Sequence, residues 1–406
     1  MRFMIRHIDE QTILTDEITL DALGAAVPQA VVKAVVAELG VAEDRRRKLP
    51  AELGLLLSVA MNLFTQDSLD QVLVKLLKGL RFIWPDPTFV PASKGAICQA
   101  RYRLGAPPTV ALFHRVCQPM ATAATPGAFL FGLRLMAIDG TTEDIPDTPA
   151  HARTFGRHTS ARGESAFPQV KGVYLIACGR HAIVDAGFWP CHTSERLGGL
   201  RLLRSVRAGM LLMWDRGFHS FDMAQQSRAR GAHFLGRVPS HVQLKPLRRL
   251  PDGSYLAYLY PAEYQRRKGG EPLLVRVIVY TFTDPARPGY GETHRLMTSL
   301  LEAEPYPALE LACAYHERWE IEIAIDELDT HQRLVRHPLR SQKPVGVIQE
   351  LYGLLIAHDV VRRVMHDAAL QAGIDPDRLS FINAVRLICD AIPEFQMVAP
   401  EQMPLL

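Results

Sequence analysis

The sequence lacks the cysteine patterns that mark secreted or zinc-stapled proteins. Its 406 residues include six cysteines. None of them forms a CxxC pair or another close spacing. Scattered cysteines of this kind argue against a structural zinc site and against a disulfide framework, and they fit a reducing compartment.

Long apolar runs are missing as well. The segment MRFMIRHIDEQTILTDE (1–17) has no apolar centre of the kind found in signal peptides. The longest apolar stretches, such as ELGLLLSVAMNLF (52–64), are too short and too interrupted to span a bilayer. We therefore expect a soluble intracellular protein of the cytoplasm, without a membrane partner.

Charge of either sign is not in large excess. The net charge is +3, and 48% of the residues are hydrophobic against 22% charged, which is a globular composition. The length predicts two or three domains. Basic residues gather at 45–48, 266–268 and 331–343. A basic run is usually a solvated surface, so none of these segments alone predicts nucleic-acid binding.

The hydrophobic periodicity divides the chain into three regions. Residues 1–127 show helical spacing, including a basic helix between the N-cap Ser93 and Gly105. Residues 128–345 alternate short apolar strands with helices, which predicts an α/β sheet. Within them, 239–300 is β-rich and rich in Pro and Gly, which predicts an all-β insertion, and 306–333 predicts one long helix. Residues 346–406 are predicted to be helical again.

Three acidic residues stand out by their placement. Asp139 and Asp215 each end an apolar strand, and Glu322 lies in the middle of the helix predicted over 306–333. Carboxylates at the carboxyl ends of neighbouring strands converge at one edge of a sheet. Together the three would form an oxygen-only pocket suited to Mg²⁺ or Mn²⁺. The alternative is that each Asp only caps a turn or a helix.

The segment YHERWEIEIAIDELDTH (315–331) places further polar groups beside Glu322. At helical spacing, Tyr315, Arg318 and Glu322 share one face, and seven more residues lead to Asp329. Arg318 and Glu322 also have the spacing of a surface salt bridge. Tyr315 has two readings, core packing or a hydrogen bond to phosphate.

Other residues near these positions have simpler interpretations. Trp319, Ile323 and Ile325 are expected in the core, where they would hold the helix against the sheet. Arg216, directly after Asp215, is either a phosphate contact or an ion-pair partner for the acids.

Several of these motifs resemble the DDE transposases of bacterial insertion sequences, of the insertion-element-four type. IDGTTEDIPDTPAHARTFGR and LLMWDRGFHSFDM resemble the segments that hold the first two catalytic acids. YHERWEIEIAIDEL resembles the signature Tyr-x-x-Arg-x-x-x-Glu, and HPLRSQKPVGVIQELYGLLIAHDVVR resembles the segment that follows it. SKGAICQARYRLGAPPTVALFHRV and the preceding helices resemble the N-terminal domain of that family.

The resemblance implies a fold, a site and a reaction. It implies a helical DNA-binding domain (1–127), a ribonuclease H-like catalytic core (128–345) with the β-rich insertion, and a C-terminal helical region (346–406). The catalytic and metal-binding acids would be Asp139, Asp215 and Glu322, holding two Mg²⁺ or Mn²⁺ ions. The implied DNA contacts are Tyr315, Arg318, Arg216, Arg101 and Arg103.

The implied activity is DNA cleavage and strand transfer at the terminal inverted repeats of a mobile element. Water would attack at the element end, and the freed 3′-hydroxyl would attack target DNA. Pairing two ends implies a homodimer in the synaptic complex. The alternatives are a catalytically impaired DNA-binding descendant and a nuclease of the same fold.

The sequence departs from the family pattern at two positions. The signature ends in a Lys seven residues after its Glu, whereas this chain has Asp329, and His151 stands where the family tends to have Asn. A carboxylate in place of that Lys would repel a DNA phosphate by about 1 kcal/mol at partial burial. Lys343, Arg333 and Arg336 are candidates to compensate.

Overall fold

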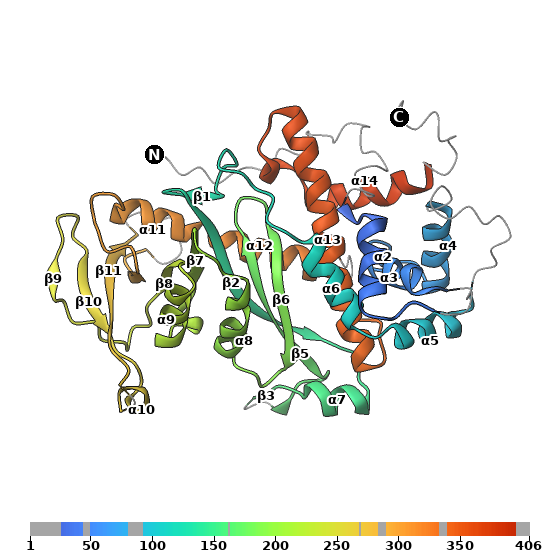
Figure 1. The fold of residues 1–406 in the computed structure, drawn as a ribbon, viewed down its shortest axis with the longest axis horizontal. Helices are drawn as coiled ribbons and strands as arrows, with labels where there is room; N and C mark the ends of the chain where they lie inside the picture. Colours follow the sequence, from blue (N-terminus) through green and yellow to red (C-terminus); the bar gives the residue numbers. More distant parts are fainter. Residues whose placement is uncertain are drawn as a thin grey trace. The chain divides into compact units, whose positions relative to one another are not determined.

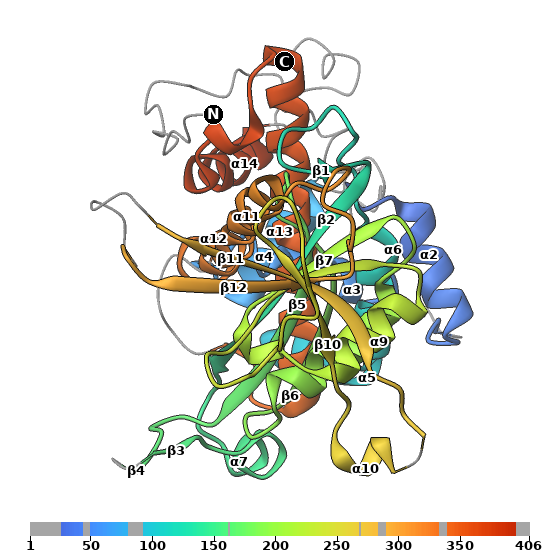
Figure 2. The same cartoon turned by 90° about the vertical axis from the view of Figure 1, so that its left-hand side faces the viewer.

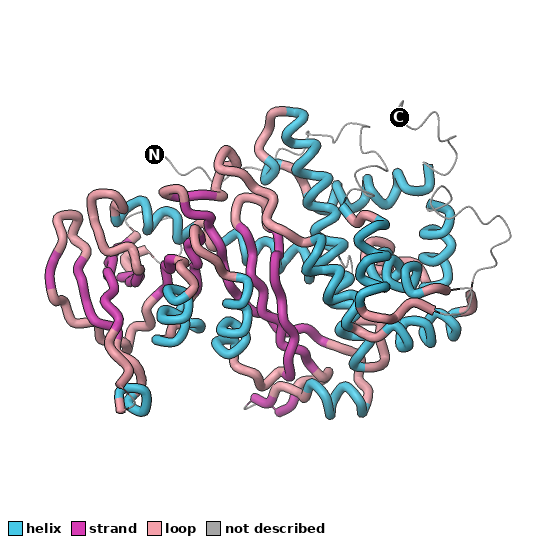
Figure 3. Tube along the Cα trace, viewed as in Figure 1, coloured by secondary structure: helices cyan, strands magenta, loops and turns pink. Residues whose placement is uncertain are grey.

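The computed structural model describes the residues in the ranges 26–43, 49–79, 92–160, 163–267, 269–282, 290–332 and 339–394. The chain forms two compact units. We call one the helical unit (residues 1–118, 144–169 and 325–406) and the other the sheet unit (residues 119–143 and 170–324). Figure 3 shows helices dominating the first and long strands the second. The division into 1–127, 128–345 and 346–406 stays a prediction.

The helices predicted for the N-terminal region are present in the helical unit. They are α2 (Gln29–Glu38), α3 (Ala51–Ala60), α4 (Leu69–Gly79), α5 (Lys94–Leu104) and α6 (Pro107–Val116), followed by α7 (Pro149–Phe155). The backbone N–H of Ala96 donates to Ser93 Oγ at 3.4 Å, so Ser93 caps α5 as predicted. Gly105 ends this helix with a φ of +73°, which glycine adopts without strain.

The core of the helical unit is the helix α13 (Pro344–Ala372), which packs on α3 and α6 and is followed by α14 (Phe381–Glu394). Among the described helices, α13 alone has the length and apolar character to cross a membrane, but 83% of its most apolar stretch is buried inside the protein. A Cβ on Gly353 would lie 2.0 Å from the carbonyl oxygen of Ser58. This glycine therefore permits a close approach of α13 to α3.

The sheet unit is built on one mixed sheet, whose described part has 10 strands (Figure 1). One half follows the order β6-β5-β2-β7-β8. Its strands are β2 (Leu133–Asp144), β5 (Gln169–Ala177), β6 (Ala182–Pro190), β7 (Met210–Trp214) and β8 (His233–Arg237), and the short β1 (Phe129–Leu130) pairs with β2. β2, β7 and β8 are parallel neighbours, and β5 and β6 form the antiparallel hairpin predicted around Gly179.

Helices cover both faces of this sheet. α9 (Phe221–Ala229) lies on one face, and α11 (Ala308–His316) and α12 (Trp319–Asp326) lie on the other (Figure 2). α8 (Glu195–Leu202) packs on β6 and beside α9. α8 carries two glycines because it lies very close to its neighbours: a Cβ on Gly198 would be 2.6 Å from Val173 Cγ2, and one on Gly199 would be 2.7 Å from Phe218 Cδ1. The α/β architecture expected from the sequence is thus present.

The β-rich segment 239–300 extends the same sheet. It contributes β9 (Arg248–Arg249), β10 (Tyr255–Leu259), β11 (Leu273–Thr281) and β12 (Thr293–Thr298), and also the short helix α10 (Glu263–Arg266). β12 pairs antiparallel with β8, so these strands continue the sheet through β12. The predicted strands are there, but a separate all-β insertion is not confirmed.

The helix predicted over 306–333 is interrupted twice. α11 ends at His316, and the backbone N–H of Arg318 donates to the carbonyl of Tyr315 at 3.2 Å, three residues back. This tight turn separates α11 from α12, and from Glu327 to Gln332 the chain forms a π-helix. The regular 3.6-residue period therefore does not run from Tyr315 to Asp329.

The turn also changes which side chains of α12 are buried. Trp319 is 59% exposed and Ile323 is 49% exposed, so the prediction that they lie in the core was wrong. Ile325 is partly buried. Ile321 and Ala324 are fully buried instead. A helix that restarts after a turn presents a different face from the one extrapolated from α11.

Candidate catalytic site

Two neighbouring parallel strands bring Asp139 and Asp215 together. In the register of β2 and β7, Ile138 is the partner of Trp214. The next residues along the chain are Asp139 and Asp215, which therefore lie side by side. Asp215 follows the last residue of β7, as predicted, but the prediction that Asp139 ends a strand was wrong, because β2 continues to Asp144.

Each aspartate also makes a local hydrogen bond through one oxygen. Asp139 Oδ1 accepts the backbone N–H of Gly140 at 2.8 Å, and Asp215 Oδ1 accepts that of Gly217 at 2.8 Å. The capping interpretation is therefore correct for Asp215, which caps the short helix Arg216–Phe218, but Asp139 lies within β2 and caps neither a turn nor a helix. The second oxygen of Asp139 faces a guanidinium.

Arg318 connects the strand to the helix. Its Nη1 lies 3.1 Å from Asp139 Oδ2, and its Nη2 lies 2.6 Å from Glu322 Oε1. The ion pair with Glu322 was one reading of the sequence, but the guanidinium is buried and bridges two acids from different elements. Burial alone would lower the pKa of Arg318, but the hydroxyl of Tyr315 and the two carboxylates raise it, which keeps the bridge charged.

Asp139 is poised to change its protonation state near neutral pH. Burial raises its pKa from 3.8 to about 6, against the lowering effect of the Gly140 N–H and of Arg318. The carboxylates of Asp215 and Glu322 raise it further. Asp215 and Glu322 therefore both lie within electrostatic reach of Asp139.

The donor set suits a hard divalent cation. The described residues contain no group of three His, Cys, Asp or Glu side chains already arranged as a cation cage. The three acids offer only oxygen ligands, which Mg²⁺ and Mn²⁺ prefer, and a cation would relieve the repulsion that raises the pKa of Asp139. By donor chemistry, the residues fit such an ion.

Tyr315 lies close to Asp215 and Arg318. Its side chain is buried, and its hydroxyl donates to the carbonyl oxygen of Trp214 at 3.4 Å. Burial raises the pKa of Tyr315 to about 12, and the nearby Asp215 contributes to that rise. Of its two readings, core packing describes this structure, with the ring against the end of the strand that precedes Asp215.

The predicted arginine contacts have different surroundings. Arg216 is exposed, and within the described residues no ion pair joins it to any of the three acids. Its contact with phosphate stays a prediction. Arg101 is only 3% exposed, and its guanidinium donates to Ser341 Oγ and to the carbonyl of Gly346. Arg101 is thus held inside the helical unit, and its contact with DNA stays a prediction.

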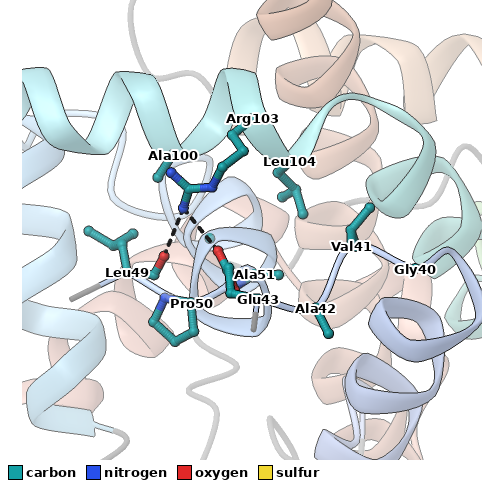
Figure 4. Close-up of a pocket in the computed structure, with 11 residues that line it drawn as sticks. Gly40, Val41, Ala42, Glu43, Leu49, Pro50, Ala51, Ala100, Arg103 and Leu104 are labelled. Carbon is teal, nitrogen blue, oxygen red and sulfur yellow. Dashed lines mark hydrogen bonds and ion pairs between the residues drawn. The ribbon is translucent and has the colours of Figure 1, made fainter. Parts of the chain in front are cut away.

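Arg103 lies at a pocket of about 270 Å³ between α3 and α5 (Figure 4). Its Nη2 forms an ion pair with Glu43 Oε1 at 2.9 Å and donates to the carbonyl of Leu49 at 3.2 Å. The carboxylate of Glu43 also accepts the N–H of Ala51, the first residue of α3. Arg103 thus remains partly exposed but already has an acidic partner.

The departures from the family pattern lie in the helical unit. Asp329 is partly buried in the π-helical segment, and His151 is fully buried, with Nδ1 2.7 Å from the carbonyl of Pro146. Lys343 is exposed and packs over the ring of Tyr102. Arg333 and Arg336 fall outside the described residues.

The role of Glu320 was not predicted from the sequence. This carboxylate is buried, accepts the backbone N–H of Gly179 and lies beside Gly127. It ties α12 to the turn of the β5–β6 hairpin, and so fixes the helix that carries Glu322. The alternation of Glu and Ile in WEIEIAID gave no sign which glutamate would point inward.

Comparison with known proteins identifies this arrangement. The insertion element 4 transposase N-terminal family matches residues 17–114, and the transposase DDE domain family matches residues 130–360. The chain is similar to the transposase InsG for insertion sequence element IS4 of Escherichia coli (strain K12), with 30% identity over 396 residues, 95% of this chain and 86% of that protein.

A second relative is the putative transposase InsZ of the same organism, with 28% identity over 149 residues, 36% of this chain and 50% of that protein. The DDE domain implies a ribonuclease H-like fold for the sheet, and its family uses divalent metal ions. The chain belongs to the insertion element 4 family of DDE transposases, enzymes that cleave DNA and transfer its strands.

Proposed function

We propose that Asp139, Asp215 and Glu322 are the catalytic carboxylates of this transposase. The observation that carries the proposal is the bridge through Arg318, which joins the Asp139 carboxylate to Glu322 while Asp215 lies on the adjacent strand. Burying acids around one guanidinium costs folding free energy, because the charges lose their hydration. Such clusters of perturbed ionisable groups are typical of functional sites.

The three carboxylates would hold two divalent ions, Mg²⁺ or Mn²⁺. When bound, such ions supply an activated water and stabilise the leaving oxygen of an in-line displacement at phosphorus. Asp139 must be ionised to take part, and since its pKa is about 6 without a bound ion, a cation competes with a proton for this carboxyl below about that pH. Arg318 holds the acids in place through Nη1 and Nη2, and its proposed contact with a DNA phosphate would require it to exchange one of these partners.

The proposed substrates are the terminal inverted repeats of the element and the target DNA. Water attacks the phosphodiester at the element end, and the freed 3′-hydroxyl then attacks the target, so each step exchanges one P–O bond for another. Arg216, Trp319 and Ile323 are exposed beside the acids and are proposed to face the DNA. Arg103 is proposed to contact DNA after exchanging its partner Glu43.

The working assembly is proposed to be a homodimer on two paired ends, in the bacterial cytoplasm. We propose that the segment 239–300 acts as the family's insertion between the second Asp and the Glu helix, although its strands extend the sheet.

The carboxylate of Asp329 would repel the phosphate backbone of bound DNA, so an Asp329→Lys substitution is expected to strengthen binding to end DNA.

An assay of cleavage and strand transfer on end DNA tests the proposed roles. Glu322→Gln keeps the shape of the side chain but removes its charge, so we expect at least a hundredfold loss of cleavage with end binding retained. Glu310→Gln, at an exposed acid in the first turn of α11, is the matched control and should keep full activity. Cleavage by Glu322→Gln at the rate of the unmodified protein would exclude Glu322 from the site.

A further inference from the structure

A cation continues the row of residues in which Asp139 and Asp215 lie. In the register of β7 and β8, Trp214 is the partner of Gly236, so the next residues along the chain, Asp215 and Arg237, are neighbours on parallel strands. Because β7 lies between β2 and β8, Arg237 flanks Asp215 on the side away from Asp139.

Arg237 lies within electrostatic reach of Tyr315, as Asp215 and Arg318 do. Burial raises the pKa of Tyr315, the charges of Arg318 and Arg237 oppose that rise, and Asp215 adds to it. The same two arginines act on Tyr280 of β11, whose pKa burial raises to about 12. Both guanidiniums and the Asp215 carboxylate are therefore close to the hydroxyl of Tyr315.

A neutral imidazole holds Arg237 in place. Its Nη2 donates to Nδ1 of His294, on β12, at 2.8 Å. A guanidinium has no acceptor, so Nδ1 must accept, and the proton of the neutral ring is on Nε2. His294 is only 7% exposed, and burial together with the charge of Arg237 lowers its pKa. His294 therefore orients Arg237 without neutralising its charge.

The charge of Arg237 is not compensated by an acid. Arg276, which is fully buried in the same unit, is paired with Asp252. Arg237 is partly buried, yet within the described residues no ion pair joins it to Asp215 or to another carboxylate. A guanidinium withdrawn from water without a counter-ion is unfavourable, and a bound anion relieves this.

We propose that Arg237 binds a phosphate of the DNA strand that is cut, at or next to the cleaved bond, and that His294 positions it. The inference rests on the proposed function, because it takes Asp215 as an acid of the site. A guanidinium can donate two parallel hydrogen bonds to one phosphate and offsets the negative charge that the acids place near the strand. The competing explanation is that the pair only joins β8 to β12.

A methylphosphonate scan of end DNA separates the two explanations. Each DNA carries one neutral methylphosphonate, at the cleaved bond or at a neighbouring phosphate, and its Kd is measured without divalent ions. For unmodified DNA, Arg237→Gln should raise the Kd about tenfold or more and lower the slope of log Kd against log salt by about 0.9. At one position the methylphosphonate should weaken the unmodified chain about as much, and Arg237→Gln less than about twofold further.

Matched variants of the partner residue test its positioning role. His294→Asn keeps an acceptor near the place of Nδ1 and should bind nearly as the unmodified chain does. His294→Phe keeps a ring but removes the acceptor, and should show part of the loss at the same phosphate. Arg248→Gln, at an exposed arginine of β9, is the control, and its Kd should not depend on which of these phosphates is neutral.

Thermal unfolding checks that each variant is folded, and Arg237→Lys replaces Arg237→Gln if the latter is not. A loss that is the same for every methylphosphonate DNA, or no loss at all, would overturn the inference. In that case loss of cleavage by Glu322→Gln would leave the proposed function standing. Cleavage by Glu322→Gln at the unmodified rate would instead remove the proposed function, whatever Arg237 shows.

Discussion

Asp139 is under two opposing influences, which together explain why the proposed site would bind a cation. Burial and the neighbouring acids raise its pKa to about 6, while Gly140 and Arg318 favour the charged form. In the absence of a divalent ion, a proton is the alternative partner for this carboxyl. The sequence predicted that the residue would sit at the edge of the sheet, but its environment depends on Arg318, 179 positions away.

The stability of the cation-free protein should therefore fall as the pH rises. Because the folded pKa of Asp139 is about 6 and the unfolded value is 3.8, this group stabilises the fold fully below pH 3.8, and the effect is lost as the pH rises through about 6. The loss is about 3 kcal/mol, since one pKa unit corresponds to about 1.4 kcal/mol. Mg²⁺ or Mn²⁺ should then raise the Tm clearly at pH 7.5 and little at pH 5.

Thermal unfolding at both pH values, with and without Mg²⁺, checks this expectation. Asp139→Asn is the matched variant, and it should lose most of the difference in Tm shift between the two pH values. An equal Tm shift at pH 5 and pH 7.5 in the unmodified protein would contradict the role assigned to Asp139.

At the scale of elements, the sequence predicted the strands well and the catalytic helix less well. The strands around Asp139 and Asp215, the hairpin at Gly179 and the helices capped by Ser93 and by glycines follow from local signals, and all are present. The turn at Arg318 has no such signal, because no Gly or Pro marks it. It arises where Arg318 and Glu320 are held by partners far along the chain.

The exposure of Trp319 after this turn leads to a prediction about DNA binding. Trp319→Ala removes a large surface side chain, so we expect the free energy of unfolding to change by less than about 0.5 kcal/mol. Loss of contact with the DNA should weaken end binding about fivefold or more, because stacking of a base on an aromatic ring contributes about 1–3 kcal/mol.

A fluorescence anisotropy titration with end DNA measures this effect. Leu309→Ala is the control, because Leu309 is an apolar residue of α11 that is 76% exposed. Equal binding by Trp319→Ala and the unmodified protein would remove Trp319 from the proposed DNA surface.

The packing of α13 on α3 makes a second prediction at this scale. In Gly353→Ala the new methyl group would meet the Ser58 carbonyl at 2.0 Å, so the two helices must move apart. We expect a loss of about 2 kcal/mol or more in the free energy of unfolding. Gly95→Ala in α5 meets no atom within 4 Å, and should be neutral or stabilising. Chemical denaturation of both variants measures the difference, and equal stability would contradict the close approach.

At the scale of the whole molecule, the family match covers both units, whereas the chemistry is assigned to the sheet unit. The N-terminal family spans 17–114 and the DDE family spans 130–360. The family predicted from the sequence motifs is confirmed, while the catalytic role of the three acids stays a prediction. The motifs did not predict that Arg101 would be buried, because its partners Ser341 and Gly346 come from the other end of the chain.

The central claim is that Asp139, Asp215 and Glu322 hold the divalent ions of a DNA transposase. Its most direct test is strand transfer by Asp215→Cys in Mg²⁺ and in Mn²⁺. A thiolate is a poor ligand for Mg²⁺ and a better one for Mn²⁺. The account predicts no detectable transfer in Mg²⁺ and partial recovery in Mn²⁺. Transfer by Asp215→Cys in Mg²⁺ at the rate of the unmodified protein would contradict it.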